Sequence, residues 1–161
     1  MSIPDRQLIT GPVEDYLQEY GKDILESESF LSLKTHMHHF RSNTYAHCVA
    51  VTIKALSFAK KMRIPVHIPT LVRGCLLHDY YLYNHRNEER IKWHLLKHPA
   101  IAAENAKRDF NLNSLGVDMI LGHMWPINPF YIPVTREGWI LLYSDKIVSI
   151  RDRFFLKPEK H

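Results

Sequence analysis

The hydrophobic positions of this chain recur at helical spacing along most of its length. A long helix is predicted over residues 45–62, because Asn43 and Thr44 can cap its start and the segment Arg63-Ile64-Pro65 ends it. Apolar residues cover most of the circumference of this helix, which is typical of a central position in the fold. No segment alternates apolar and polar residues as a half-buried strand does, so the pattern predicts an all-α protein.

Further helices are predicted on both sides of this central one. Residues 13–40 form an amphipathic helical segment that is broken near Gly21, and Pro69 lies near the first turn of a helix that ends at His78-Asp79. Pro99 argues against helical geometry at the preceding residue, so residues 88–97 and 99–110 are predicted as separate helices. Two more helices cover residues 114–124 and 136–153, and the prolines between them predict an extended surface connection or lid.

Length and composition fit one globular domain. A chain of 161 residues can bury a sizeable core, and 45% hydrophobic with 24% charged residues is an ordinary balance for such a domain. We therefore predict a single domain over residues 1–161, a bundle of about six to eight helices. Its core is expected over about residues 43–153, and residues 1–40 are expected to pack against it as a helical segment.

The charge pattern narrows the classes of partner. Twenty-one Lys+Arg are scattered among seventeen Asp+Glu, for a net charge of +4, without a basic stripe. Specific nucleic-acid binding is therefore not predicted, whereas a small anionic substrate is compatible with the charge. The chain shows neither a secretion signal nor an apolar run of membrane-spanning length, so we expect a cytoplasmic protein without a membrane partner. The sequence leaves the oligomeric state open.

The chemistry is concentrated where an apolar helical run ends in His78 and Asp79. A buried histidine and aspartate side by side are costly unless a cation lies between them, and a divalent metal is the simplest candidate. The pair alone also fits an ordinary helix end, with the histidine against the helix dipole. Asp145 lies within the apolar run of the last helix and needs a buried partner of its own. Cys48 and Cys75 are predicted to be buried thiols rather than ligands.

The order of the remaining histidines favours the metal. His47, His98 and His123 each have a structural explanation when taken singly, such as a hydrogen-bonded core histidine. Together with His78-Asp79 and Asp145 they give the order His, His-Asp, His, His, Asp, with each member on or at the end of a different predicted helix.

In this order the chain resembles the HD-domain metal-dependent phosphohydrolase superfamily, and within it small stand-alone bacterial HD proteins. The resemblance spans most of the domain, although Asn84-His85 and His94-Leu95-Leu96 depart from the pattern of these relatives near the substrate pocket. No Gly-Tyr-Pro motif is present, so the HD-GYP subfamily is not indicated. The matching segments are Asn43-Thr44-Tyr45-Ala46-His47-Cys48, residues 71–83, His98-Pro99 with Ala103-Glu104-Asn105-Ala106, His123-Met124-Trp125-Pro126 and Ser144-Asp145-Lys146.

The resemblance implies a site for two divalent transition metals, with Asp79 shared between them. Nitrogen and carboxylate ligands suit iron, manganese, zinc or cobalt without choosing among them. The implied reaction is hydrolysis of a phosphate ester or anhydride, with a nucleotide as the expected substrate, by a metal-activated hydroxide. The implied ligands are His47, His78 and Asp145 on one ion, His98 and His123 on the other, and Asp79 on both.

Four residues are candidates for contact with the substrate. Lys146 follows Asp145 directly, and HD proteins commonly have a lysine at this place, so we expect it to bind phosphate and to be catalytic together with Asp79; an ordinary surface lysine is the alternative. Arg73 is a second phosphate candidate, with a salt bridge that holds the fold as its alternative. Tyr83 and Trp125 flank ligands and are expected to stack on a base or sugar, unless they serve packing.

Two other classes of function stay open. A sensor module would bind metal and nucleotide without turnover, and a di-iron oxygenase is conceivable because some HD relatives cleave carbon bonds. All six expected ligand positions are filled in this chain, which favours the enzyme. The altered segment at Asn84-His85 leaves the sensor open.

Overall fold

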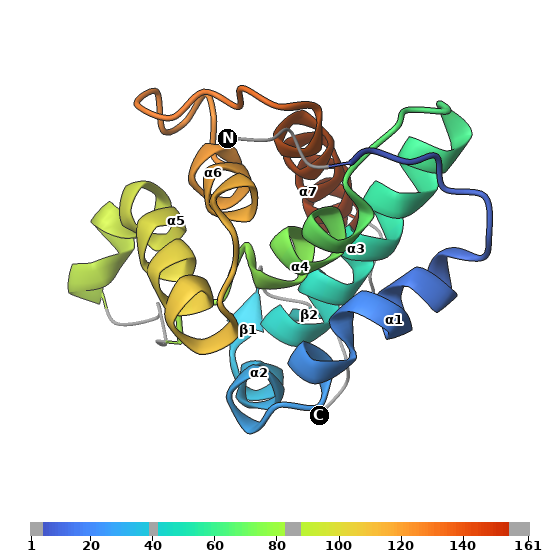
Figure 1. Cartoon of the computed structure of the whole chain (residues 1–161). Helices are drawn as coiled ribbons and strands as arrows, with labels where there is room; N and C mark the ends of the chain where they lie inside the picture. The colour runs from blue at the N-terminus through green and yellow to red at the C-terminus, as the bar shows by residue number, and fades with distance from the viewer. Residues whose placement is uncertain (1–4, 39–41, 83–87, 155–161) are drawn as a thin grey trace.

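The computed structural model describes residues 5–38, 42–82 and 88–154, which form a bundle of α-helices (Figure 1). The predicted all-α fold is confirmed: within these ranges the chain has seven α-helices, and its β-structure is one antiparallel pair of two-residue strands, β1 (Met37–His38) and β2 (Ser42–Asn43). A short 3₁₀ helix, η1, spans Ser32–Thr35. The α-helices are α1 (Val13–Leu25), α2 (Glu28–Leu31), α3 (Thr44–Lys61), α4 (Ile68–Leu77), α5 (Glu88–Phe110), α6 (Ser114–Gly122) and α7 (Arg136–Phe154).

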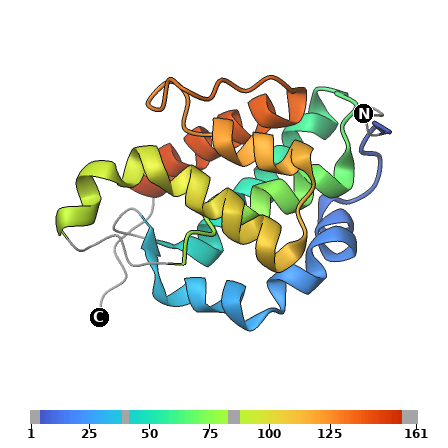
Figure 2. The same cartoon turned by 60° about the vertical axis from the view of Figure 1, so that its left-hand side comes forward.

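The central helix predicted from the apolar pattern is α3. Asn43 caps it, because its side-chain oxygen accepts a hydrogen bond from the amide of Ala46 at 2.8 Å. The helix packs against both α4 and α7 (Figure 2). Val51, Ala55 and Leu56 on α3 are fully buried. Of the polar residues singled out in the sequence, His47 lies in the first turn of α3, His78-Asp79 follows the last turn of α4, and Asp145 lies in the middle of α7.

The N-terminal helices share the core of the later ones. Leu17 and Ile24 of α1 and Phe30 of α2 belong to the same hydrophobic cluster as Leu141 and Val148 of α7. Burial of this continuous cluster is the main favourable contribution to folding. None of the helices in the described ranges combines the length and the apolar character needed to cross a bilayer.

The break predicted near Gly21 is wrong. α1 continues through Gly21 to Leu25, and the change of direction comes at Ser27, whose hydroxyl caps α2 by accepting from the amide of Phe30. A Cβ added to Gly21 would lie 2.6 Å from Leu76 Cδ1 on α4. The glycine therefore allows two helices to approach closely, at the small cost that a glycine carries inside a helix.

The helix break predicted at His98-Pro99 is also wrong, because α5 is continuous and contains Pro99. Proline removes one backbone donor, so the carbonyl of Leu95 loses its helical partner. Leu95 is 45% exposed, and water can replace that donor on this side of the helix. The ribbon of α5 bends in its N-terminal half (Figure 1). His94 and His98 consequently lie one turn apart on the same helix.

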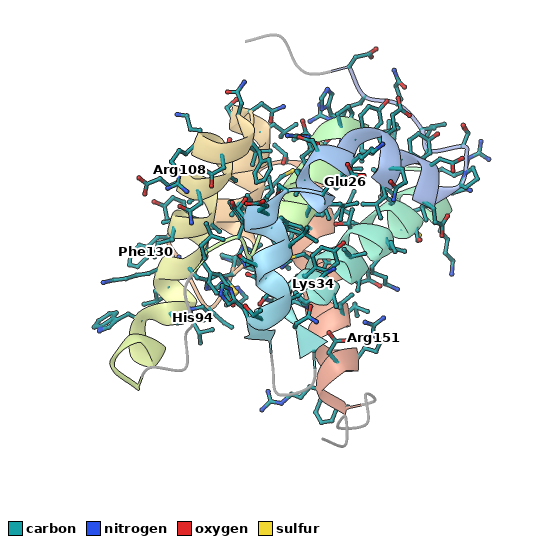
Figure 3. The ribbon with its side chains drawn as sticks, turned by 90° about the horizontal axis from the view of Figure 1, so that it is seen from below. Glu26, Lys34, His94, Arg108, Phe130 and Arg151 are labelled. Atoms are coloured by element: carbon teal, nitrogen blue, oxygen red, sulfur yellow. The ribbon has the colours of Figure 1, made fainter. Side chains whose placement is uncertain are left out.

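The connection between α6 and α7 has no helix or strand, as its prolines predict. Pro133 packs back against the two helix ends, since a Cβ on either Gly122 or Gly138 would lie 3.2–3.3 Å from it. Phe130 and Val134 are more than three-quarters exposed, and Figure 3 shows Phe130 at the outside of the bundle. The segment is thus anchored at its ends while its apolar tip faces solvent.

A buried ion pair fastens the N-terminal segment to α7. Arg6 donates to both carboxylate oxygens of Glu137, at 2.8 and 3.1 Å, and the amide of His67 donates to the same carboxylate at 3.0 Å. Burial on its own raises the pKa of Glu137, but the bonds from Arg6 and His67 outweigh it and hold the pKa below its usual range. The Glu137 side chain is fully buried, whereas that of Arg6 is 21% exposed.

Arg6→Ala is expected to lower the free energy of unfolding by about 2 kcal/mol at pH 7, because it leaves Glu137 buried without its counter-ion; the partial exposure of Arg6 places this below the range for fully buried pairs. A depressed carboxyl pKa contributes stability above the unfolded pKa, and this stability is lost as the pH falls through the folded pKa. The difference between the two proteins should therefore shrink below about pH 4. Urea unfolding at several pH values measures it.

Lys22→Ala is the matched control, because Lys22 and Glu26 form an ion pair at 4.0 Å in which both side chains are about two-thirds exposed. Its loss should cost less than about 0.5 kcal/mol. Equal costs for the two substitutions would contradict the assignment of a buried anchor at Glu137.

Candidate metal centre

The structure brings the six predicted ligand side chains together in one buried cluster. Each of the helices α3 to α7 contributes at least one of these side chains, and all six side chains are buried. The contributions are His47 from the first turn of α3, His78 and Asp79 from the end of α4, His98 from α5, His123 from the end of α6 and Asp145 from α7.

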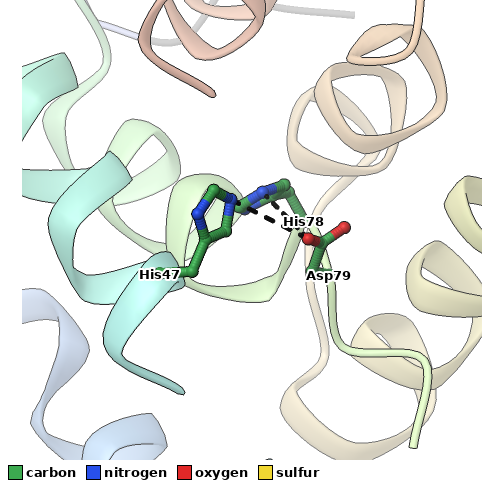
Figure 4. Close-up of side chains that lie close together, drawn as sticks. All are labelled: His47, His78 and Asp79. Atoms are coloured by element: carbon green, nitrogen blue, oxygen red, sulfur yellow. Dashed lines mark ion pairs between the residues drawn. The ribbon is translucent and has the colours of Figure 1, made fainter. Parts of the chain in front are cut away.

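Asp79 lies between two pairs of histidines. Its Oδ2 is 3.5 Å from Nε2 of His78 and 3.9 Å from Nε2 of His47. Dashed lines mark these two pairs in Figure 4. Its other oxygen, Oδ1, is 3.3 Å from Nε2 of His98 and 3.6 Å from Nε2 of His123. The two oxygens of one carboxylate therefore face two different pairs of imidazoles.

Asp145 closes the side of the cluster formed by α3 and α4. Its Oδ1 lies 3.1 Å from Nε2 of His47 and 3.6 Å from Nε2 of His78, and it also accepts from the hydroxyl of Ser149 at 3.2 Å. This is the buried partner that an aspartate within an apolar helical run requires. Both carboxylates of the cluster thus face imidazole nitrogens.

Three of the histidines are oriented by backbone carbonyls of their own helices. The Nδ1 atom of His78 bonds the carbonyl of Cys75 at 2.8 Å, that of His98 bonds the carbonyl of His94 at 2.9 Å, and that of His123 bonds the carbonyl of Ile120 at 2.6 Å. A carbonyl only accepts, so Nδ1 carries the proton, and Nε2 of a neutral ring presents a lone pair to the cluster.

These lone pairs need a cation. Nε2 of His98 and Nε2 of His123 are 3.0 Å apart, and two lone pairs at that distance repel unless a proton or a metal lies between or beside them. Nε2 of His78 is buried and has no hydrogen-bond partner among the described residues. Metal ligation satisfies such atoms, and the bond from the other ring nitrogen is the arrangement found at metal-ligating histidines.

The pKa shifts of the cluster residues also indicate that the site favours a bound positive charge. Burial is the largest influence and lowers the pKa of His78, but Asp79, Cys48 and Asp145 together outweigh it and raise the pKa well above its usual value. Burial raises the pKa of Asp145, yet its hydrogen bond with Nε2 of His47 and the nearby ring of His78 bring the pKa well below the usual range. Burial lowers the pKa of His123, which favours the neutral ring that binds a metal.

Three groups of donor atoms in the described residues could hold a metal ion, with the atoms of each group within 4.8 Å of one another. The thiols are unsuited to join them: Cys48 and Cys75 are buried and free, and burial raises the pKa of Cys75 to about 12. The donor set is therefore nitrogen and carboxylate oxygen, which suits first-row transition metals. The groups are His47 with His78 and Asp79, His78 with His123 and Asp145, and Asp79 with His98 and His123.

Lys146 lies at the edge of the cluster. Its ammonium group is 3.3 Å from Oδ2 of Asp145 and 3.4 Å from the carbonyl of His123, and its side chain is 34% exposed. The position places a positive charge beside the carboxylate and within reach of solvent. Contact of this lysine with a substrate stays a prediction.

The other candidate substrate residues lie in different settings. Arg73 donates to the carboxylate of Asp23 at 2.7 and 3.0 Å and to the carbonyls of Tyr20 and Phe110, which favours the alternative that it holds the fold. Trp125 packs edge-on against Trp139, with 5.5 Å between the ring centroids. Tyr83, like the segment Asn84-His85, lies outside the described residues.

Two further residues near the cluster lie outside the six predicted ligands. The ring of His94 stacks on that of His98 with centroids 4.6 Å apart, a contact hidden by the predicted helix break. Asp152 is 1% exposed, and its Oδ2 lies 3.6 Å from Nδ1 of His47. Its spacing of seven residues from Asp145 puts both acids on one face of α7, and this was the available signal.

A comparison of the chain with protein-family models gives no match, and comparisons with curated proteins and with solved structures give no significant match either. The interpretation of the cluster therefore depends on its own geometry.

Proposed function

We propose that this chain is a metal-dependent phosphohydrolase of the HD type, acting on a small phosphate ester or anhydride such as a nucleotide. The observation that carries the proposal is the convergence of four imidazole Nε2 atoms on two buried carboxylates, a set of donors that a bound cation satisfies. The order of these residues along the chain supports the HD assignment through the resemblance described above.

The division of the Asp79 oxygens supports two metal positions with a shared carboxylate. Oδ2 would serve the position held by His47, His78 and Asp145, and Oδ1 would serve the position held by His98 and His123. These six side chains leave coordination positions free for water and substrate oxygens, as catalytic sites require. A closed structural site would instead use all of its positions for protein ligands.

Bound divalent ions supply Lewis acidity to a phosphoryl group and lower the pKa of water. The chain contributes the rest. The carbonyls behind His78, His98 and His123 hold their rings in one tautomer, so no reorganisation is needed when charge develops. Lys146 offers an ammonium group beside Asp145, placed to bind a phosphate oxygen at the rim of the cluster.

The proposal predicts that the metal-loaded chain releases phosphate from at least one member of a panel of nucleotides and phosphate esters, assayed anaerobically so that ferrous iron is retained. Stripping with a chelator should abolish release, and adding back manganese, zinc, cobalt or ferrous iron should restore it. Phosphate release by the loaded and stripped protein is the measurement.

Lys146→Met keeps all six ligands and separates binding of the metal from binding of phosphate. It should retain the metal content while phosphate release falls by about 10²-fold, the effect of removing one charge-stabilising donor. Metal and nucleotide bound without turnover in the wild-type chain would contradict the enzyme and favour the sensor.

A further inference from the structure

The four imidazoles of the cluster are oriented from outside in two different ways. His78, His98 and His123 use backbone carbonyls three or four residues earlier on their own helices. His47 lies in the first turn of α3, and its Nδ1 faces a side chain of another helix, with Asp152 Oδ2 at 3.6 Å. One ring of the cluster thus has an anionic group behind its Nδ1, and the other three have neutral carbonyls there.

Asp152 is itself held in a fixed direction. Its Oδ1 accepts from Nη2 of Arg151 at 2.8 Å and from Nε at 3.1 Å, while Ser42 Oγ lies 3.3 Å from Oδ2. The side chain of Asp152 is 2% exposed, whereas that of Arg151 is 52% exposed. Figure 3 shows Arg151 near the C-terminal end of α7. Oδ1 is thereby occupied from the solvent side, and Oδ2 points inward to His47.

An inward-facing carboxylate has a defined effect on the ring it faces. A carboxylate that faces Nδ1, here at 3.6 Å, favours the tautomer with the proton on that nitrogen, which leaves the Nε2 lone pair of His47 to face Asp145 and Asp79, 3.1 and 3.9 Å away. A carboxylate behind a histidine also raises the basicity of the ligating nitrogen, and such partners matter for metal affinity. Asp145 and Asp152 lie two turns apart, so α7 supplies both a ligand and the group that orients a neighbouring ligand.

We propose that Asp152 is a positioning residue of the metal centre, which fixes the tautomer and direction of His47 and strengthens it as a metal ligand. The inference rests on the metal site of the proposed function. Asp152 itself coordinates nothing, and it acts through the His47 ring.

Asp152→Asn tests the proposal with little change of volume. The amide removes the negative charge, and its NH₂ group can donate to Nδ1, which selects the wrong tautomer for ligation. The dissociation constant for Co²⁺, measured by competition with a chromophoric chelator, should rise by about 10–100-fold. In the zinc-loaded wild type, proton NMR should show the Nδ1 proton of His47 at low field, and this resonance should move or vanish in the variant.

Arg153→Gln is the matched control, because Arg153 is an exposed residue next to Asp152 on α7 and its replacement leaves both Asp152 and Arg151 in place. Its Co²⁺ dissociation constant should change by much less than about tenfold. Circular dichroism and thermal unfolding of the metal-free proteins report the fold of both variants. Equal losses of metal affinity in the two variants, accompanied by equal losses of stability, would overturn the positioning role and leave a structural one.

The outcomes separate this inference from the proposed function. A wild-type chain that binds no metal would overturn both. A wild-type chain that binds metal, beside an Asp152→Asn chain that binds it equally well, would overturn only the role of Asp152. Should the substitution prevent folding, the wild-type spectrum alone decides, since the absence of a hydrogen-bonded Nδ1 proton on His47 would overturn the inference.

Discussion

Asp79→Ala is expected to abolish both metal binding and phosphate release. Asp79 is the only one of the six cluster residues whose two carboxylate oxygens face separate pairs of imidazoles in the described structure. Its loss removes a ligand from both proposed positions and half of the negative charge of the two cluster carboxylates. Hydrolysis should fall by at least about 10³-fold, because losing the metals removes more than one charge-stabilising donor. Calorimetric titration with Zn²⁺ and a phosphate-release assay measure the two effects.

Asp118→Ala is the matched control for this substitution. Asp118 is an exposed aspartate on α6, so its replacement should change neither metal binding nor activity. Circular dichroism of both variants checks that the bundle is intact. Zinc binding by Asp79→Ala at the wild-type affinity would contradict the shared carboxylate.

His98→Ala is expected to empty one metal position and leave the other filled. His98 lies close to Oδ1 of Asp79 and to Nε2 of His123, whereas His47 and His78 lie closer to Oδ2 of that carboxylate. The metal content should fall from about two equivalents to about one, and hydrolysis should drop by about 10²-fold or more because a single ion cannot clamp both the attacking and the leaving oxygen. Elemental analysis of the purified variant gives the ratio.

His94→Ala controls for the position on α5. The carbonyl of His94, not its ring, bonds Nδ1 of His98, so the substitution leaves that bond in place. The variant should keep the wild-type metal content. A loss of metal in His94→Ala equal to that in His98→Ala would mean that the ring stack, rather than ligation by His98, maintains the site.

Local sequence rules were sufficient for most of the helices because caps and apolar periodicity act over a few residues. Asn43 caps α3, as its position predicts, and Asn113 caps α6 in the same way. The same rules failed at Gly21 and Pro99. At Gly21 the helix continues because the glycine packs closely against Leu76 of another helix, and at Pro99 it continues because the preceding turn is exposed to solvent. Neither the close packing nor the exposure can be predicted from neighbouring residues.

The candidate site was likewise predictable from the sequence only in part. The order of histidines and aspartates along the chain was enough to select the six side chains that converge, because they lie on or at the ends of five separate helices. The surroundings of the site depend on tertiary packing. Arg73 is engaged by Asp23, fifty residues earlier, and Asp152 reaches His47 only because α3 and α7 pack side by side. Periodicity along one helix does not contain this information.

The metal content of the wild-type chain tests the central claim most directly. The protein would be purified anaerobically, without a chelator and without a histidine tag, and its metals would be counted per chain by elemental analysis. The account predicts about two equivalents of a transition metal, as expected for a two-metal site. A folded chain that retains no metal, and takes up none when manganese, zinc, cobalt or ferrous iron is added, would contradict it.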